Sequence, residues 1–203
     1  MKDPNSVLEK LKSGNQRFVK KLYDQCYANQ NSRQPQLVEI QNPSAIVVGC
    51  SDARVPVETV FDQRNGELFV IRVAGNVITP TQLGSIEFAA QKFETRLILV
   101  LGHSQCGAVD ATLELLSKPE VEISSNLQSI VEKIRPVARS VIDSNSGVSK
   151  DALLGKVIRA NVLAAVDQIK QNSAILGDLI ENDWLTVTAA EYDLTTGVVE
   201  FIK

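Results

Sequence analysis

Two short segments of the sequence carry side chains that could hold a metal ion. The first, CSDAR, spans residues 50–54, and the second, HSQC, spans residues 103–106. Cysteine thiolates and a histidine imidazole are ligands that zinc prefers in proteins. The two-residue gap between His103 and Cys106 allows one turn to present two ligands to the same ion. The sequence therefore predicts a zinc site at Cys50, His103 and Cys106.

The position of Asp52 leaves two coordination states open. As a fourth ligand, its carboxylate would close the site around the metal. Paired with Arg54 through two parallel hydrogen bonds, it would leave three protein ligands and an open position for water. Three ligands and a water are typical of catalytic zinc, which lowers the pKa of the bound water to about 7.

A simpler interpretation needs no metal. Buried cysteines are common core residues, and an exposed Asp52–Arg54 pair would contribute little to stability. The metal hypothesis is favoured because the only histidine and two of the three cysteines fall at the ends of expected strands. The remaining cysteine, Cys26, lies in a polar connector without a partner, and we interpret it as incidental.

Both segments directly follow apolar runs that are typical of buried strands, AIVV at residues 45–48 and LILVL at residues 97–101. Further strands are expected at 68–73, 185–189 and 198–202, and helices at 81–93, 107–116, 125–142 and 151–169. Alternating strands and helices predict an α/β fold with a mostly parallel central β-sheet flanked by helices. Loops at the carboxyl ends of parallel strands share one edge of the sheet, so the two segments should converge.

The two ends of the chain are expected to add an N-terminal helical arm and a C-terminal hairpin at the edge of the sheet. Residues 5–22 have the pattern of an amphipathic helix with Gly14 as a weak point, and residues 24–43 form a connector. The turn expected at residues 192–197 joins the last two strands into a C-terminal edge hairpin. We therefore expect one domain over residues 1–203, with a helical arm and connector at 1–42 and an α/β core at 43–203.

The composition excludes several classes of protein. Of the 203 residues, 44% are hydrophobic and 22% are charged, which is typical of globular proteins. A net charge of -3 argues against a nucleic-acid partner. No apolar run is long enough to span a membrane, and the N-terminus lacks the apolar core of a signal peptide. We expect a cytoplasmic protein with no membrane partner and no disulfide framework.

Beyond these patterns, the chain resembles the β-class carbonic anhydrases. The resemblance rests on CSDARVPVETVFDQRNGELFVIRVAGN at residues 50–76 and LGSIEFAAQKFETRLILVLGHSQCGAV at residues 83–109. It extends from LKSGNQRF at residues 11–18 to YDLTTGVVEF at residues 192–201. The C-x-D-x-R motif followed by H-x-x-C is far more specific than either motif alone.

The resemblance implies a reaction and a set of metal ligands. The reaction is the reversible hydration of carbon dioxide to bicarbonate and a proton. One zinc ion per subunit would be held by Cys50, His103 and Cys106. Asp52 and Arg54 would form the gating dyad of the family, so that the metal is open when Asp52 pairs with Arg54. With His103 bound to metal, no second histidine is available to shuttle protons.

The resemblance also implies a substrate pocket shared between two subunits. Gln41 stands where the family places a glutamine that binds substrate, and Phe69 and Phe88 stand where aromatic walls are expected. The backbone N–H of Gly107 would approach the substrate. Gln41 and the aromatic residues would serve the zinc of the neighbouring subunit, and the N-terminal helix would pack on that subunit. We expect a homodimer that can pair into a tetramer or a larger assembly.

Three alternative functions remain open. The same zinc site could hydrolyse carbonyl sulfide or carbon disulfide. A closed four-ligand site would indicate a zinc-binding protein without catalysis. A redox thiol protein is disfavoured because the motif is H-x-x-C and not C-x-x-C.

Overall fold

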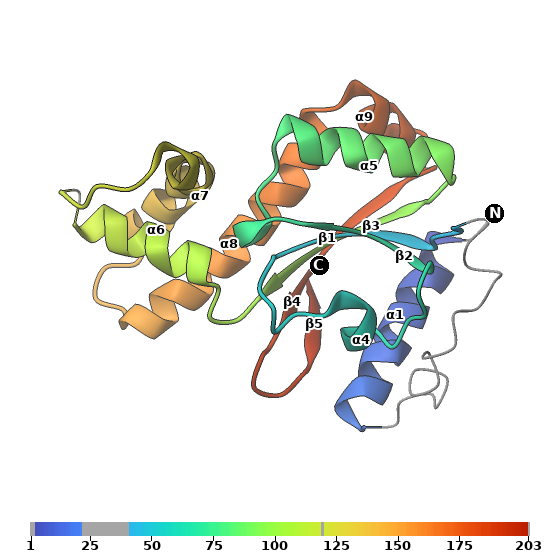
Figure 1. Ribbon diagram of the computed structural model, residues 1–203, viewed down its shortest axis with the longest axis horizontal. Coiled ribbons are helices and arrows are strands. Elements are labelled where there is room, and N and C mark those ends of the chain that lie inside the picture. Colours follow the sequence, from blue (N-terminus) through green and yellow to red (C-terminus); the bar gives the residue numbers. More distant parts are fainter. Residues whose placement is uncertain (1–2, 22–40, 119, 203) are drawn as a thin grey trace.

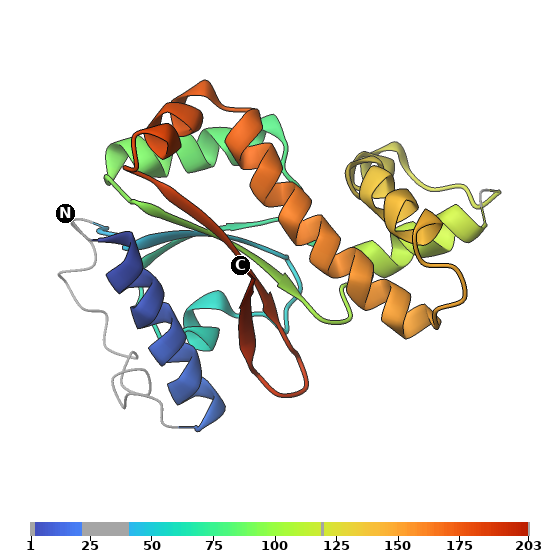
Figure 2. The same cartoon turned by 180° about the vertical axis from the view of Figure 1, so that it is seen from behind.

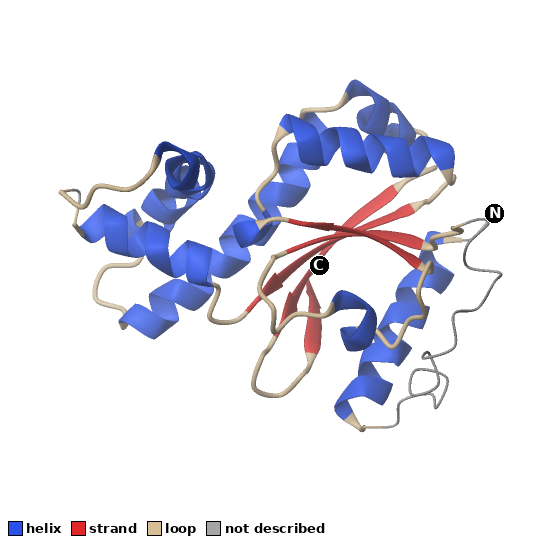
Figure 3. Ribbon diagram, in the orientation of Figure 1, coloured by secondary structure: helices blue, strands red, loops and turns tan. Residues whose placement is uncertain are grey.

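A five-stranded sheet forms the centre of the computed structural model, which describes residues 3–21, 41–118 and 120–202. The strands lie in the order β2 (Leu68–Arg72), β1 (Ala45–Gly49), β3 (Leu97–His103), β4 (Thr186–Tyr192) and β5 (Val199–Ile202). The first four strands are parallel, and β5 is antiparallel to β4. Figure 3 shows the strands as one twisted layer between helices. The predicted α/β fold with a mostly parallel sheet and an edge hairpin is confirmed.

The register of the two central strands brings the chemistry-bearing segments to one edge. β1 ends at Gly49, which pairs with Leu101 of β3, and β3 continues to His103. Cys50 follows β1 directly, and Cys106 follows the turn after β3. Because both strands run in the same direction, these residues share the carboxyl edge of the sheet.

Helices cover both faces of the sheet (Figures 1 and 2). α5 (Pro80–Lys92), α8 (Lys150–Gln171) and α9 (Ala174–Glu181) pack on one face. α1 (Pro4–Val19) and α4 (Val57–Val60) pack on the other. α6 (Gly107–Ser117) and α7 (Ser125–Asp143) pack with part of α8 in a lobe beside the sheet.

The N-terminal helix packs against its own chain. A Cβ at Gly14 would overlap the carbonyl oxygen of Phe61, so glycine allows α1 to approach the α4 segment closely. The next residue, Asn15, is buried and donates hydrogen bonds to the carbonyl oxygens of Val60 and Gly197, at 3.2 and 2.9 Å. Its Oδ1 accepts a hydrogen bond from the N–H of Val199 at 2.9 Å. α1 is thereby fastened to the C-terminal hairpin.

The structure adds three elements that the sequence pattern missed. α4 and the 3-10 helix η1 (Ala74–Asn76) are too short to show a helical period. α9 does carry a start signal, since the hydroxyl of Ser173 caps the helix by accepting a hydrogen bond from the N–H of Leu176. β4 also runs on to Tyr192, which was expected in the turn, because it pairs with His103.

Some expectations fall outside the described residues. They are most of the connector and Cys26. The first helix, expected to run to residue 22, ends earlier, at Val19, because Lys20 leaves the helical conformation as its C-cap. Within the described part of the chain, no helix is long and apolar enough to cross a membrane.

Candidate metal centre

Three buried side chains meet at the carboxyl edge of the sheet. One ligand atom each from Cys50, His103 and Cys106 lies within 4.8 Å of the other two. Cys50 comes from the end of β1, His103 from the last position of β3, and Cys106 from the N-cap of α6. The sequence predicted these three residues from their types and their positions after buried strands.

The orientation of His103 fits a metal ligand. Its Nδ1 lies 2.8 Å from the carbonyl oxygen of Ser104, to which it can donate a hydrogen bond. Its Nε2 is buried and has no hydrogen-bond partner among the described residues. A buried polar atom without a partner is costly, and a metal ion at the two sulfur atoms would satisfy it. Two thiolates and one imidazole are a ligand set that suits zinc.

The backbone around Cys50 is held from β2 and from η1. The guanidinium of Arg72 donates hydrogen bonds to the carbonyl oxygens of Cys50 and Asp52, at 2.8 and 2.5 Å. The N–H of Gly75 points at the Cys50 sulfur at 3.4 Å, and a φ of 66° at Gly75 permits this approach. Sequence reasoning did not single out Arg72 or Gly75, because only the folded chain brings them to Cys50.

The pKa values of the two thiols shift in opposite directions when no metal is bound. The neighbouring Cys106 thiol, and then the neighbouring His103 imidazole, lower the pKa of Cys50 to about 4, although burial acts in the opposite direction. The same Cys50 contact, together with burial, raises the pKa of Cys106 far above its usual range. Burial lowers the pKa of His103, but the nearby Cys50 sulfur outweighs burial and raises that pKa. The three groups therefore titrate as a coupled set, and metal binding would displace protons from the thiols.

Asp52 lies beside the cluster but is bound to Arg54. Its Oδ1 accepts hydrogen bonds from Nε and from the N–H of Arg54, at 3.0 and 2.9 Å, and its Oδ2 accepts one from Nη2 at 2.7 Å. The same Oδ2 is 3.9 Å from Nε2 of His103. The hydrogen bonds of Arg54 hold the pKa of Asp52 well below its usual range. Asp52 is thus an ionised carboxylate within reach of the cluster.

The sequence from residue 45 to residue 199 matches the family model described as carbonic anhydrase. The chain belongs to this family. It is 35% identical to a carbonic anhydrase of Mycolicibacterium smegmatis over 98% of its length, covering 93% of that protein. It is 31% identical to carbonic anhydrase 2 of Mycobacterium tuberculosis, over 96% of this chain and 91% of that protein. The resemblance expected from residues 50–76 and 83–109 is confirmed.

Solved structures place this carbonic anhydrase in the β class. The β-carbonic anhydrase CafA of Aspergillus fumigatus superposes with a TM-score of 0.77 at 23% identity, covering 98% of this chain and 90% of that chain. The Coccomyxa β-carbonic anhydrase, solved with acetazolamide, gives a TM-score of 0.74 at 25% identity and covers 100% and 87%. The shared fold agrees with the sheet described above.

Four residues were expected to line the substrate pocket of this carbonic anhydrase. Three of them lie away from the metal-ligand cluster of the same chain. Gln41 is exposed and precedes the amino end of β1. Phe69 pairs in register with Ile46, about 13 Å along the strand direction from Cys50. Phe88, on α5, is 51% exposed, and its ring centroid lies 6.3 Å from that of Phe69. One copy of the chain does not bring these residues to Cys50.

Gly107 is the fourth expected pocket residue, and it lies beside the cluster. It begins α6 directly after Cys106 and is exposed. A Cβ at this position would meet no atom within 4 Å. Packing within one copy therefore does not require glycine here.

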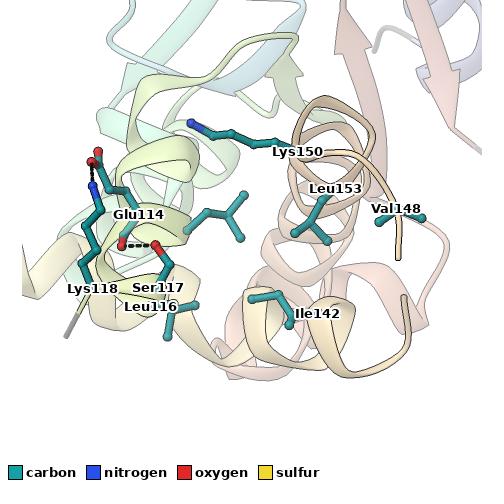
Figure 4. A pocket seen from close by; sticks show the side chains of 9 residues that line it. Glu114, Leu116, Ser117, Lys118, Ile142, Val148, Lys150 and Leu153 are labelled. Atoms are coloured by element: carbon teal, nitrogen blue, oxygen red, sulfur yellow. Dashed lines mark hydrogen bonds and ion pairs between the residues drawn. The ribbon is translucent and has the colours of Figure 1, made fainter. Parts of the chain in front are cut away.

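A cavity of about 570 Å³ lies elsewhere, between α6, α7 and α8 (Figure 4). Its walls are mainly aliphatic, and they include Leu113, Leu116, Ile142, Val148 and Leu153. The two lysines at its rim are paired with carboxylates, Lys118 with Glu114 at 3.3 Å and Lys150 with Asp110 at 3.1 Å. The cavity shares no residue with the Cys50 cluster, and it is not the metal centre.

Proposed function

We propose that this carbonic anhydrase catalyses the reversible hydration of carbon dioxide to bicarbonate and a proton, with one zinc ion per chain. The observation that carries the proposal is the buried Cys50–His103–Cys106 cluster, in which Nε2 of His103 lacks a partner. These three side chains would hold the zinc. When bound, zinc lowers the pKa of a coordinated water to about 7 and so supplies hydroxide at neutral pH.

The ion pair of Asp52 and Arg54 supports a catalytic site with an open position. Both oxygens of Asp52 accept hydrogen bonds from Arg54, which would disfavour this carboxylate as a fourth ligand. Nη2 of Arg54 also lies 3.4 Å from the carbonyl oxygen of Gln105, in the segment that carries the other two ligands. Arg54 therefore joins the two segments, and its hydrogen bonds to Asp52 would keep that carboxylate off the metal. The competing function, a closed zinc site without catalysis, would need the opposite placement of Asp52.

A second copy of the chain would complete the substrate pocket. Gln41 and Phe88 are exposed, and Phe69 is partly buried beside Phe88, with their ring centroids 6.3 Å apart. These three residues lie away from the cluster of their own chain and would serve the cluster of a neighbour. Each copy would supply Gly107 to its own site and these three residues to its partner. A solved fungal relative is described as tetrameric. We expect at least a dimer here, which sedimentation of the zinc-loaded protein measures.

We place the protein in the cytoplasm because of its free thiols. We infer that the buffer accepts the proton because the chain has a single histidine. Cys50 and Cys106 are free thiols, and a reducing compartment keeps them available for metal. The only histidine of the chain belongs to the cluster, so no other imidazole can carry a proton near neutral pH. Turnover that rises with buffer concentration would support the second point, and turnover independent of buffer would contradict it.

The deciding experiment is stopped-flow hydration of carbon dioxide by protein of known zinc content at mildly alkaline pH. We expect fast hydration in proportion to zinc, inhibited by anions or sulfonamides. Cys106→Ser, which removes one ligand, should lose both zinc and activity. Zinc-loaded protein that does not hydrate carbon dioxide would overturn the proposal. In that case, hydrolysis of carbonyl sulfide and of carbon disulfide by the same protein is measured. Hydrolysis of either compound would identify it as the substrate of the site.

A further inference from the structure

Ser104 lies between the metal centre and the C-terminal hairpin. Its carbonyl oxygen is 2.8 Å from Nδ1 of His103. Its hydroxyl accepts a hydrogen bond from the N–H of Leu194 at 2.9 Å, and its own N–H donates to the carbonyl oxygen of Tyr192 at 2.9 Å. Ser104 and Leu194 are 90 residues apart in the sequence. One residue therefore connects His103 to the hairpin through three hydrogen bonds.

The contact with Nδ1 decides which nitrogen of His103 faces the cluster. A proton on Nδ1, donated to the carbonyl oxygen of Ser104, leaves Nε2 with its lone pair for a metal. The direction of that carbonyl oxygen depends on the peptide plane after Ser104. Two hydrogen bonds hold Ser104 in place. Its N–H donates to the carbonyl oxygen of Tyr192, and its hydroxyl accepts from the N–H of Leu194.

The hairpin that provides both contacts is itself anchored. Asn15 of α1 bonds to Gly197 and Val199, on the far side of the turn. Oδ1 of Asp193 accepts hydrogen bonds from the N–H groups of Thr195 and Thr196, at 3.0 and 2.7 Å, which shapes the turn. The hydroxyl of Ser104 is therefore held by a fixed support and not by a free loop.

We infer that the hydroxyl of Ser104 is a positioning group for the metal ligand His103. It fastens the Ser104 backbone to the hairpin, so that the carbonyl oxygen stays in line with Nδ1 and Nε2 stays directed at the cluster. Ser104 acts only through His103. The inference rests on the proposed zinc site, and it adds a residue that supports the affinity of that site for metal.

The first test measures the zinc dissociation constant by competition with a chelator. Ser104→Ala should weaken zinc binding between about 10-fold and 100-fold, the range typical for partners of metal-bound histidines. Ser104→Thr keeps the hydroxyl and should weaken zinc binding by less than about 10-fold. Thr196→Ala is the matched control, because the Thr196 hydroxyl also bonds within the hairpin, at 2.8 Å to Asp193 and 3.3 Å to Val198, but does not contact Ser104. Thr196→Ala should bind zinc as the wild type does.

The second test uses the fact that the chain has one histidine. Protein labelled with ¹⁵N-histidine and loaded with zinc should give one imidazole spectrum, with Nδ1 protonated and its proton protected from solvent exchange. In Ser104→Ala this protection should fall. If that variant does not fold, the wild-type spectrum still decides, because an Nδ1 proton that exchanges as in free imidazole overturns the inference.

The remaining outcomes separate this inference from the proposed function. Wild-type protein that binds no zinc would overturn the proposed function and this inference together. Wild-type protein that binds zinc, with Ser104→Ala binding equally well, would overturn the inference alone. Equal weakening in Ser104→Ala and Thr196→Ala would assign the effect to the hairpin as a whole and would also overturn it.

Discussion

Both carboxylate oxygens of Asp52 accept hydrogen bonds from the guanidinium of Arg54, at 3.0 Å from Nε and 2.7 Å from Nη2. This two-point contact fixes the carboxylate in orientation as well as in charge. The same Oδ2 that accepts from Nη2 lies 3.9 Å from Nε2 of His103, so Asp52 stands between Arg54 and the cluster. The candidate metal centre thus has a carboxylate nearby, and we propose that Arg54 controls whether this carboxylate can reach the metal.

Arg54→Ala should lower kcat/KM for carbon dioxide while zinc remains bound. Without the guanidinium, Asp52 is free to coordinate the metal and occupy the position meant for water. We expect a loss between about 10-fold and 100-fold, as for other groups that surround metal ligands. Stopped-flow rates and zinc content are measured on the same sample.

Arg54→Lys is the companion variant. It keeps the positive charge but cannot make the two-point contact, so its activity should lie between those of the wild type and Arg54→Ala. Full activity in Arg54→Ala would show that Asp52 does not compete for the metal.

Cys50→Ser, His103→Ala and Cys106→Ser should each lose zinc. Each variant removes one of the three ligand atoms that lie within 4.8 Å of one another. Cys26→Ser is the control, since we expect that cysteine to play no part in the site. Zinc per chain is measured after dialysis against a weak chelator. Retention of zinc by two of the three ligand variants would mean that the metal is held elsewhere.

Gly14→Ala should destabilise the fold by about 1–3 kcal/mol, although alanine favours helices. Its Cβ would overlap the carbonyl oxygen of Phe61 and lie 3.2 Å from the side chain of Gln63, so α1 must move away from α4. Gly155→Ala is the matched control in α8, where a Cβ meets no atom within 4 Å. That variant should gain about 1 kcal/mol. Urea unfolding compares the two, and equal effects would contradict the tight packing of α1.

Glu191 and Glu200 lie opposite each other on β4 and β5 and share Arg159. Burial raises the pKa of Glu191, and the hydrogen bond of Arg159 lowers the pKa of Glu200. A raised pKa in the folded state contributes stability that is present below the unfolded value, about 4.3, and is lost as the pH rises. A lowered pKa contributes stability that is lost as the pH falls.

The two carboxylates should therefore respond to pH in opposite directions. Between about pH 4 and pH 7, Glu191→Gln should become more stable relative to the wild type as the pH rises. Glu200→Gln should become less stable relative to the wild type over the same range, by a smaller amount because Glu200 is exposed. The free energy of unfolding is measured across this range, and parallel curves for all three proteins would contradict the assignment.

The sequence determined much of the metal centre. Cys50 and His103 end buried apolar runs, and in a parallel sheet such ends share one edge whatever the details of packing. The strands could be predicted for a separate reason. Continuous apolar runs are typical of strands that are covered on both faces of a sheet. Short helices such as α4 were not, since a single turn has no period to detect.

Only the tertiary structure decided how the ligands and their neighbours are oriented. Asp52 could have closed the site or paired with Arg54, and spacing along the chain allows both. The helix that contains Gly14 showed an ordinary amphipathic pattern, and its position against Phe61 depends on a close approach between distant segments. The support of His103 through Ser104 depends on a hairpin that follows 90 residues later. Side-chain direction and long-range contact arise when the chain packs, so no local pattern records them.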